Sequence, residues 1–296
     1  MGEVSPYRIE GPALISFSGG RTSAYMLWHI IQAHGGTLPD DVHVCFANTG
    51  KEREETLRFV HECATRWGVR VRWLEWRDRR KGTPVAERFE EVGYNSAARN
   101  GEPFKALIAS KKAVPNAVQR WCTTHLKWQV CADFMEAMGY PAWTNVVGLR
   151  ADEPERTIKK RVENAAGAAI WTHALPLDDA GVRKVDVLRF WLGATQRMGV
   201  DEPQGFDLRL NPWEGNCTKC MMKGRRLLMW EVRRDPADAR DWADMEQLGG
   251  GTFTTEWSMD DLLREAQASP LLPILDEMDE YDAECGTWCL PTVRAA

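Results

Sequence analysis

The stretch ALISFSGGRTSAYML, residues 13–27, places an apolar run directly before two glycines and a helix-like segment. Residues 13–17 are predicted to form a buried strand, and residues 22–34 carry apolar side chains at helical spacing until Gly35 and Gly36. Glycines after a strand let the backbone turn tightly and direct successive N–H groups towards a phosphate, and the following helix N-terminus adds a favourable dipole. The stretch therefore predicts a strand, a phosphate-binding turn and a helix.

The same order of elements repeats along the chain. The apolar run VHVCFA (42–47) precedes a polar turn, NTGKEREE, an amphipathic segment, TLRFVHECATRWG, and a third apolar run, VRVRWLEW. A later strand, TNVVGL, begins at residue 144 and leads into RADEPERTIKKR, whereas residues 77–120 show no clear pattern. Alternating strands and helices imply right-handed crossovers and ligands at the carboxyl ends of the strands. We predict an α/β fold with a mostly parallel, twisted sheet of about five strands flanked by helices.

Composition and length limit the class of protein. The chain has 296 residues, of which 44% are hydrophobic and 27% charged, as in an ordinary globular protein. We expect an α/β nucleotide-binding domain over residues 1–200 and a cysteine-containing segment over residues 201–296, packed over the active site. The net charge of −5 argues against a nucleic-acid-binding surface over the whole protein. No apolar run reaches bilayer length and MGEVSPYRIEGP lacks a signal-peptide pattern, so a cytoplasmic protein with no membrane partner is expected.

Eight cysteines without an export signal indicate thiols, metal ligands or redox groups rather than a disulfide framework. Cys217 and Cys220 form NCTKC, a spacing that places both thiolates on one metal or cluster and leaves zinc, iron–sulfur and a redox dithiol open. The C-terminal ECGTWC adds Cys285 and Cys289. The cysteines expected to be packing residues lie in apolar or amphipathic runs: Cys45, Cys63 and Cys131.

A basic run follows Cys217. Its six cations could bind nucleotide phosphates or a nucleic-acid backbone, but a solvated helix face is the favoured interpretation. Residues 255–284 are strongly acidic and could dock onto a basic patch. The cations are Lys219, Lys223, Arg225, Arg226, Arg233 and Arg234.

Five stretches together carry a family resemblance over about residues 13–235. SFSGGRTS resembles the PP-loop of the N-type ATP pyrophosphatases, and the chain is most similar to the phosphoadenosine phosphosulfate (PAPS) reductase branch of that superfamily. FANTGKEREETLRF is similar to the family's second-strand segment, and VVGLRADEPERT to the segment that approaches the phosphates. DVLRFWL and GNCTKCMMKGRR resemble its later helix and its Cys-x-x-Cys. The resemblance implies the adenine nucleotide alpha hydrolase-like fold.

The resemblance also implies a nucleotide site. Asn48, Thr49 and Gly50 would lie near the adenosine, and Arg150 and Arg156 would act catalytically by neutralising phosphate charge in the transition state. ATP-cleaving members usually have an acidic residue where Thr22 stands. Whether a magnesium ion binds here is therefore left open. Dedicated reductases have largely lost the Ser-Gly-Gly, which favours ATP over PAPS or adenylyl sulfate. The residues expected to hold the pyrophosphate are Ser16, Ser18, Gly19, Gly20, Arg21, Thr22 and Ser23.

The same resemblance implies roles for the cysteines. Cys122, in QRWCTTHLK, matches the position where cluster-bearing reductases carry a Cys-Cys pair, but Trp121 replaces one of the two. Cys122, Cys217 and Cys220 would hold a 4Fe–4S cluster with one open iron, an arrangement that resembles cluster-dependent RNA thiolation enzymes. Cys285 resembles the reductase nucleophile, yet its acidic surroundings disfavour a thiolate. We therefore rank Cys285 or Cys289 slightly higher as a fourth ligand, and a functionless tail is a third alternative.

The sequence favours an ATP-dependent enzyme of sulfur chemistry, in which adenylation of an acceptor is coupled to sulfur transfer at an iron–sulfur cluster. Its expected partners are an adenine nucleotide and a sulfur donor or thiol reductant protein. A thiol-dependent PAPS or adenylyl-sulfate reductase and a non-catalytic nucleotide sensor with a structural zinc are the alternatives. The acceptor, which includes nucleic acid among the choices, and a homo-oligomeric state are left open.

Overall fold

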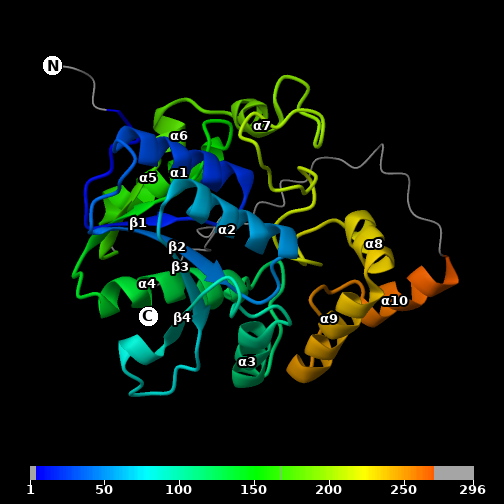
Figure 1. The fold of residues 1–296 in the computed structure, drawn as a ribbon. Helices are drawn as coiled ribbons and strands as arrows, with labels where there is room; N and C mark the ends of the chain where they lie inside the picture. The colour runs from blue at the N-terminus through cyan, green and yellow to red at the C-terminus, as the bar shows by residue number, and fades with distance from the viewer. Residues whose placement is uncertain (1–4, 168, 270–296) are drawn as a thin grey trace.

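The computed structural model describes residues 5–167 and 169–269, and within them a six-stranded sheet lies between layers of helices (Figure 1). The strand order is β4-β3-β2-β1-β5-β6. Only β4 runs antiparallel to its neighbour. The predicted α/β class and the mostly parallel sheet are confirmed. The strands are β1 (Ala13–Ser16), β2 (Val42–Asn48), β3 (Val71–Trp76), β4 (Phe89–Val92), β5 (Trp143–Val146) and β6 (Trp171–Ala174).

The sheet has one strand more than the expected five, and neither edge strand, β4 or β6, was predicted. β4 lies in the unassigned stretch 77–120 and has two exposed glutamates in its FEEV sequence. β6 has only four residues, and its burial does not alternate clearly. Short edge strands bury little surface and therefore leave a weak signal, whereas the interior strands are largely buried and were predicted from their apolar runs.

Helices cover both faces of the sheet and one end of it. Figure 1 shows α1 and α2 over one face, α4 over the other, and α8, α9 and α10 grouped beyond the sheet. None of the helices in the described ranges has the length and apolar character needed to cross a bilayer. The helices are α1 (Arg21–Ala33), α2 (Glu54–Trp67), α3 (Glu102–Lys111), α4 (Gln129–Ala137), α5 (Pro154–Ala166), α6 (Pro176–Asp179), α7 (Lys184–Leu192), α8 (Arg225–Arg234), α9 (Pro236–Gly249) and α10 (Met259–Ala268), with a 3-10 turn η1 (Val85–Glu87) and a π-helix η2 (Thr123–Trp128).

The hydrophobic core has two parts, one on each face of the sheet. Ala13 and Ile15 of β1 belong to the part that includes Trp191 of α7, while Leu14 between them belongs to the other. This alternation is the period of two that a strand imposes on its side chains. The part around Leu14 also contains Trp242 of α9, so helices α8–α10 share a core with the sheet. The domain division at residue 200 stays a prediction.

The strand order places a topological switch point beside β1. β2 pairs with one edge of β1 and β5 with the other, and all three strands are parallel. Ligands of such sheets bind in the crevice at the carboxyl ends of the strands, where the order reverses. The glycine turn lies at this position because it directly follows β1, and Gly20 is the N-cap of α1.

The turn depends on Gly19, which gives a first testable prediction. Gly19 has a φ of +79°, and a Cβ there would lie 2.6 Å from Cγ2 of Thr56. We expect Gly19→Ala to lower the free energy of unfolding by about 2–4 kcal/mol, because left-handed strain and overpacking add. Gly35→Ala is the matched control, since Gly35 has a φ of +69° with open space around it. Equal losses for the two variants in urea denaturation would contradict the steric argument.

Candidate functional site

Three segments meet at the carboxyl edge of the sheet: the turn after β1, the turn after β2 and the loop that carries Cys217. The Asn216 side chain donates a 2.9 Å hydrogen bond to the Ser18 carbonyl. The Asn216 carbonyl accepts a 2.8 Å bond from the Arg53 backbone N–H. Glu52 and Cys217 then form an antiparallel backbone bridge. The cysteine loop is therefore fixed to both turns by backbone and side-chain bonds.

The glycine turn presents a positively polarised surface. The hydroxyls of Ser18 and Ser23 lie 3.0 Å apart, and Ser23 also donates to the Gly20 carbonyl at 3.0 Å. Gly20 is the N-cap of α1, and no side chain of this residue caps the first N–H groups of the helix. Arg150 donates a 3.2 Å bond to the Thr22 hydroxyl and so lies against the same turn. A helix N-terminus with an adjacent guanidinium suits an anionic ligand.

Arg21 differs from the rest of the turn. Its guanidinium binds both carboxylate oxygens of Asp207, at 2.7 and 2.5 Å, and both side chains are buried. Its carbonyl accepts a 3.0 Å bond from Nε1 of Trp191. The guanidinium thus fastens the segment before the cysteine loop to α1. Ser16 is the last residue of β1 and is buried beneath the turn.

The turn after β2 is held by its own side chains. Asn48 is fully buried, and its amide donates to Oε1 of Glu75 at 2.7 Å and to the Ala98 carbonyl at 2.9 Å. Its Oδ1 accepts from the Gly50 N–H at 3.2 Å. Thr49 donates twice to Oε2 of Glu52, from its N–H and its hydroxyl, both at 2.8 Å. This network orients Thr49 and Glu52 towards the cysteine loop.

The segment after β5 contributes two arginines. Arg150 is buried and binds Asp152 at 2.9 Å as well as Thr22. Arg156, on the first turn of α5, forms a close ion pair with Glu153, and Glu153 also accepts the Arg150 backbone N–H at 3.0 Å. Arg150 therefore lies at the glycine turn, whereas Arg156 is linked to it through Glu153.

Three cysteines line one cavity. Cys217 and Cys220 come from the loop, and Cys122 comes from the residue before the π-helix η2. π-helices are rare and frequently occur at functional sites. Three thiols are a soft donor set that suits zinc or an iron–sulfur cluster. Within residues 5–167 and 169–269, no group of three or more His, Cys, Asp or Glu side chains is arranged to hold a metal ion. The predicted residues Cys285 and Cys289 lie outside the described residues.

Two charged side chains flank Cys217. Nζ of Lys127, in η2, lies 3.5 Å from Sγ of Cys217 and 3.2 Å from Oε1 of Glu52. The thiol in turn lies 3.6 Å from the same carboxylate oxygen. The sulfur therefore lies between one cationic and one anionic side chain.

The loop rests on a buried carboxylate, Glu231 of α8. Glu231 accepts the Lys219 backbone N–H at 2.9 Å and the Lys223 ammonium at 2.6 Å, and it forms a close ion pair with Arg53. Lys223 also donates to the Cys217 carbonyl at 2.7 Å. Burial lowers the pKa of Lys223, and the charge of Glu231 offsets part of that shift.

The basic run is the solvated helix face that the sequence favoured only on α8, where Arg225, Arg226 and Arg234 are exposed. Lys219 and Lys223 are buried, and Lys219 pairs with Asp238 at 2.7 Å. Burial would raise the pKa of Asp238, but Lys219 and Lys51 hold it below its usual value. Arg234 pairs with Glu214 at 2.6 Å. Carboxylates from distant segments neutralise these cations, which a local charge count cannot reveal.

Several residues of the site were not predicted from the sequence. Lys51, Glu52 and Arg53 lie inside the quoted NTGKEREE turn, so the motif itself was the available signal. Asn216 directly precedes Cys217 in NCTKC, and Lys127 lies in QRWCTTHLK beside Cys122. The packing roles expected for the remaining cysteines agree with their burial in the core: Cys45, Cys63 and Cys131.

Together, the fold and site define an α/β protein with a glycine turn at the switch point and a cysteine loop attached to it. Residues 12–189 match the family model described as the phosphoadenosine phosphosulfate reductase domain. The match covers more than half of the chain, and the chain belongs to this family.

Two relatives are similar to part of the chain. The "Uncharacterized nin region protein ORF290" of Escherichia phage lambda is 31% identical over 216 residues, which are 71% of this chain and 66% of the relative. The "Uncharacterized protein MJ0066" of Methanocaldococcus jannaschii is 26% identical over 171 residues, which are 57% of this chain and 29% of that protein. The chain thus spans less than two thirds of the length of either relative.

Glu231 gives the second prediction. We expect Glu231→Gln to lower the free energy of unfolding by about 3–5 kcal/mol, because it leaves buried cations without their counter-charge. The control is Glu265→Gln, which removes an exposed ion pair with Arg225 and is expected to change stability by less than about 1 kcal/mol. Urea denaturation of both variants is the measurement, and similar losses would contradict the central role of Glu231.

Proposed function

We propose that this protein is a PAPS reductase-like enzyme that binds an adenine nucleotide, with ATP favoured, and uses it for sulfur chemistry. The observation that carries the proposal is the contact between the two parts of the site. The Ser-Gly-Gly turn meets Arg150 on one side and the cysteine loop, through Asn216, on the other. A phosphate site and a set of thiols are thereby adjacent on one sheet edge.

The nucleotide would bind with its phosphates at the glycine turn. N–H groups of the turn and of α1 would donate to phosphate oxygens, and Arg150 would neutralise the charge that develops on them. An acceptor that attacks the α-phosphorus would form an adenylate and release pyrophosphate as the leaving group. The retained Ser-Gly-Gly supports ATP as the nucleotide.

The three cysteines would hold an iron–sulfur cluster, with zinc as the alternative. Their soft thiol chemistry and their shared cavity support this part of the proposal. Such a cluster, when bound, would supply a site that holds sulfur for transfer. Lys127 would hydrogen-bond the sulfur of Cys217. A sulfur donor or thiol reductant protein has to supply the sulfur or the electrons, and a role for Cys285 or Cys289 stays a proposal.

The family match supports one alternative to this proposal, a thiol-dependent PAPS or adenylyl-sulfate reductase. A domain of the PAPS reductase family can take PAPS or adenylyl sulfate instead of ATP, with a cysteine thiolate that attacks the sulfonyl sulfur and displaces the nucleotide phosphate. The same turn would then bind the phosphates of the sulfonucleotide. The two versions differ in the nucleotide that binds more tightly.

Arg150 tests the nucleotide site. We expect Arg150→Gln to weaken ATP binding by about 10–100-fold, because a charge-assisted hydrogen bond contributes about 1.5–3 kcal/mol. Adenosine, which has no phosphate, should bind both proteins equally. Arg161→Gln is the matched control, since Arg161 lies on α5 and pairs with Asp178 and Asp179. Titration calorimetry measures each affinity.

The outcomes of that titration separate the alternatives. No binding of ATP, PAPS or adenylyl sulfate to the wild type would overturn the nucleotide proposal. A clear preference for PAPS or adenylyl sulfate over ATP would replace sulfur transfer by reduction.

Metal content tests the cysteines. After strictly anaerobic purification we expect about four irons and four sulfides per chain, lost in Cys217→Ala because a cluster ligand is removed. Cys63→Ala is the control, because Cys63 is buried in the core on α2. About one zinc without sulfide would instead indicate a structural zinc and would overturn the cluster.

A further inference from the structure

Asn216 lies between two cavities. One is the cavity lined by the three cysteines, and the other is lined by Gly20 and Thr22 of the glycine turn together with Lys184 of α7. Asn216 contributes to the wall of both. Its amide packs directly against the turn, since a Cβ on Gly20 would lie 3.3 Å from Nδ2 of Asn216. Asn216 is therefore in direct contact with both cavities, so a shift of the atoms in either one can displace it.

The hydrogen bond between Asn216 and Ser18 shares a peptide unit with the turn. The Ser18 carbonyl that accepts from Asn216 belongs to the same planar peptide as the Gly19 N–H. An anion that orients the Gly19 N–H must also orient the Ser18 carbonyl, because the peptide plane rotates as one body. The strength of the Asn216 hydrogen bond is thus linked to what the turn binds.

Cys217 is the next residue; it bridges Glu52 of the turn after β2 and also contacts two lysines. The Lys223 ammonium donates to the Cys217 carbonyl at 2.7 Å, and Lys127 lies 3.5 Å from its sulfur. Lys223 is itself fixed by Glu231. The loop is therefore anchored to the turn after β2, to α8 and to η2, and Asn216 provides its side-chain contact with the glycine turn.

We propose that Asn216 is a positioning residue that couples nucleotide phosphates on the glycine turn to the exposure of the Cys217 and Cys220 thiols. The inference rests on the proposed nucleotide binding and deepens it. A filled turn holds the Ser18 carbonyl, and through Asn216 it holds the cysteine loop in one position. By linkage, a ligand that binds the cysteines changes the affinity for the nucleotide by the same factor by which the nucleotide changes the affinity for that ligand.

The test measures thiol alkylation in the full-length protein. Because thiols that hold a cluster would not be alkylated, any bound metal is first removed with a chelator. The rate of iodoacetamide labelling at Cys217 and Cys220 is then followed by peptide mass spectrometry, anaerobically, with and without α,β-methylene-ATP. We expect the nucleotide analogue to change the wild-type rate about three- to tenfold, the range of one net hydrogen bond. In Asn216→Ala the analogue should still bind, as calorimetry shows, but the labelling rate should no longer respond to it.

Two further variants sharpen the test. Asn164→Ala is the matched control, because Asn164 lies on α5, lines neither cavity and donates to the His173 carbonyl, so it should keep the wild-type response. Asn216→Asp keeps the side-chain size and removes the donor, and it replaces the alanine variant if that variant unfolds. Both Asn216 variants should lose the response.

The results distinguish this inference from the proposed function. If the analogue binds but leaves wild-type labelling unchanged, the coupling is wrong and the nucleotide site stands. If Asn216→Ala and Asn216→Asp respond like the wild type, Asn216 is not the link. Absence of analogue binding to the wild type would overturn the proposed nucleotide site, and the coupling with it.

Discussion

A single buried carboxylate, that of Glu231, determines the position of the cysteine loop. It gathers a guanidinium from the turn after β2, an ammonium from the loop and a backbone N–H between them. Buried charges are expensive to desolvate, so the network is stable only when each member has its partners. Since Arg53 follows directly from the turn after β2, the carboxylate ties the loop to the sheet edge as well as to α8. The placement of the thiols beside the glycine turn follows from this network.

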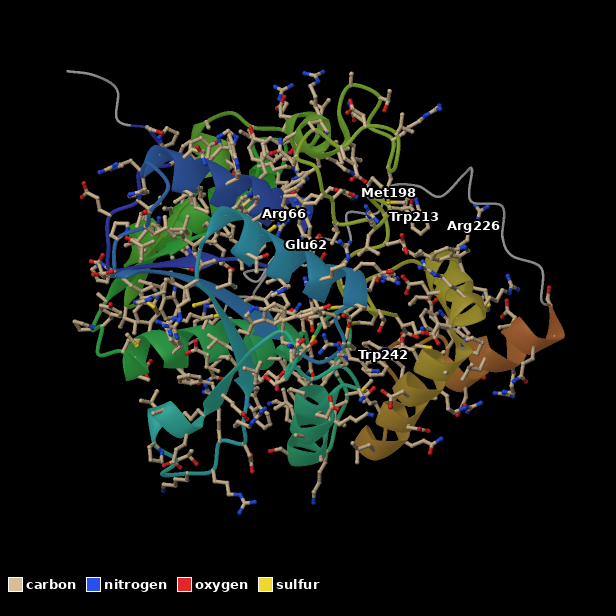
Figure 2. The ribbon with its side chains drawn as sticks, viewed as in Figure 1. Glu62, Arg66, Met198, Trp213, Arg226 and Trp242 are labelled. Carbon is tan, nitrogen blue, oxygen red and sulfur yellow. The ribbon has the colours of Figure 1, made fainter. Side chains whose placement is uncertain are left out.

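The same network neutralises part of the basic run that follows Cys217. Lys219 and Lys223 are neutralised inside the protein by carboxylates of α8 and α9, so their charge is not available to a nucleic-acid backbone. Lys51 is similarly held by Asp238 and Asp241. Figure 2 shows Trp242 on the side of α9 that faces the rest of the protein, where its indole packs with this network. The thiols therefore sit in a charge-balanced, partly apolar cavity and not on a cationic surface.

The fold was largely predictable from the sequence, because its central strands and helices have strong periodicity and glycines mark their ends. The glycine turn, Arg150 and the cysteine pair were recognisable because each lies in a short local motif. The contacts that join them were not, since they cross long stretches of chain: Arg21 and Asp207 are 186 residues apart, and Lys51 and Asp238 are 187 apart. Local patterns do not reveal which carboxylate will meet which cation. The π-helix at Cys122 was also missed, because π-helices have no clear sequence period.

The turn also limits how a divalent cation could take part. Thr22 stands where ATP-cleaving members usually have an acid, and its hydroxyl accepts a hydrogen bond from Arg150. The nearest carboxylates after β5, Asp152 and Glu153, are themselves bound to arginines. The guanidinium of Arg150 beside Thr22 makes this turn less favourable for a bare cation than for an anion. A magnesium ion would therefore have to enter with the nucleotide, held by the phosphate oxygens more than by the protein.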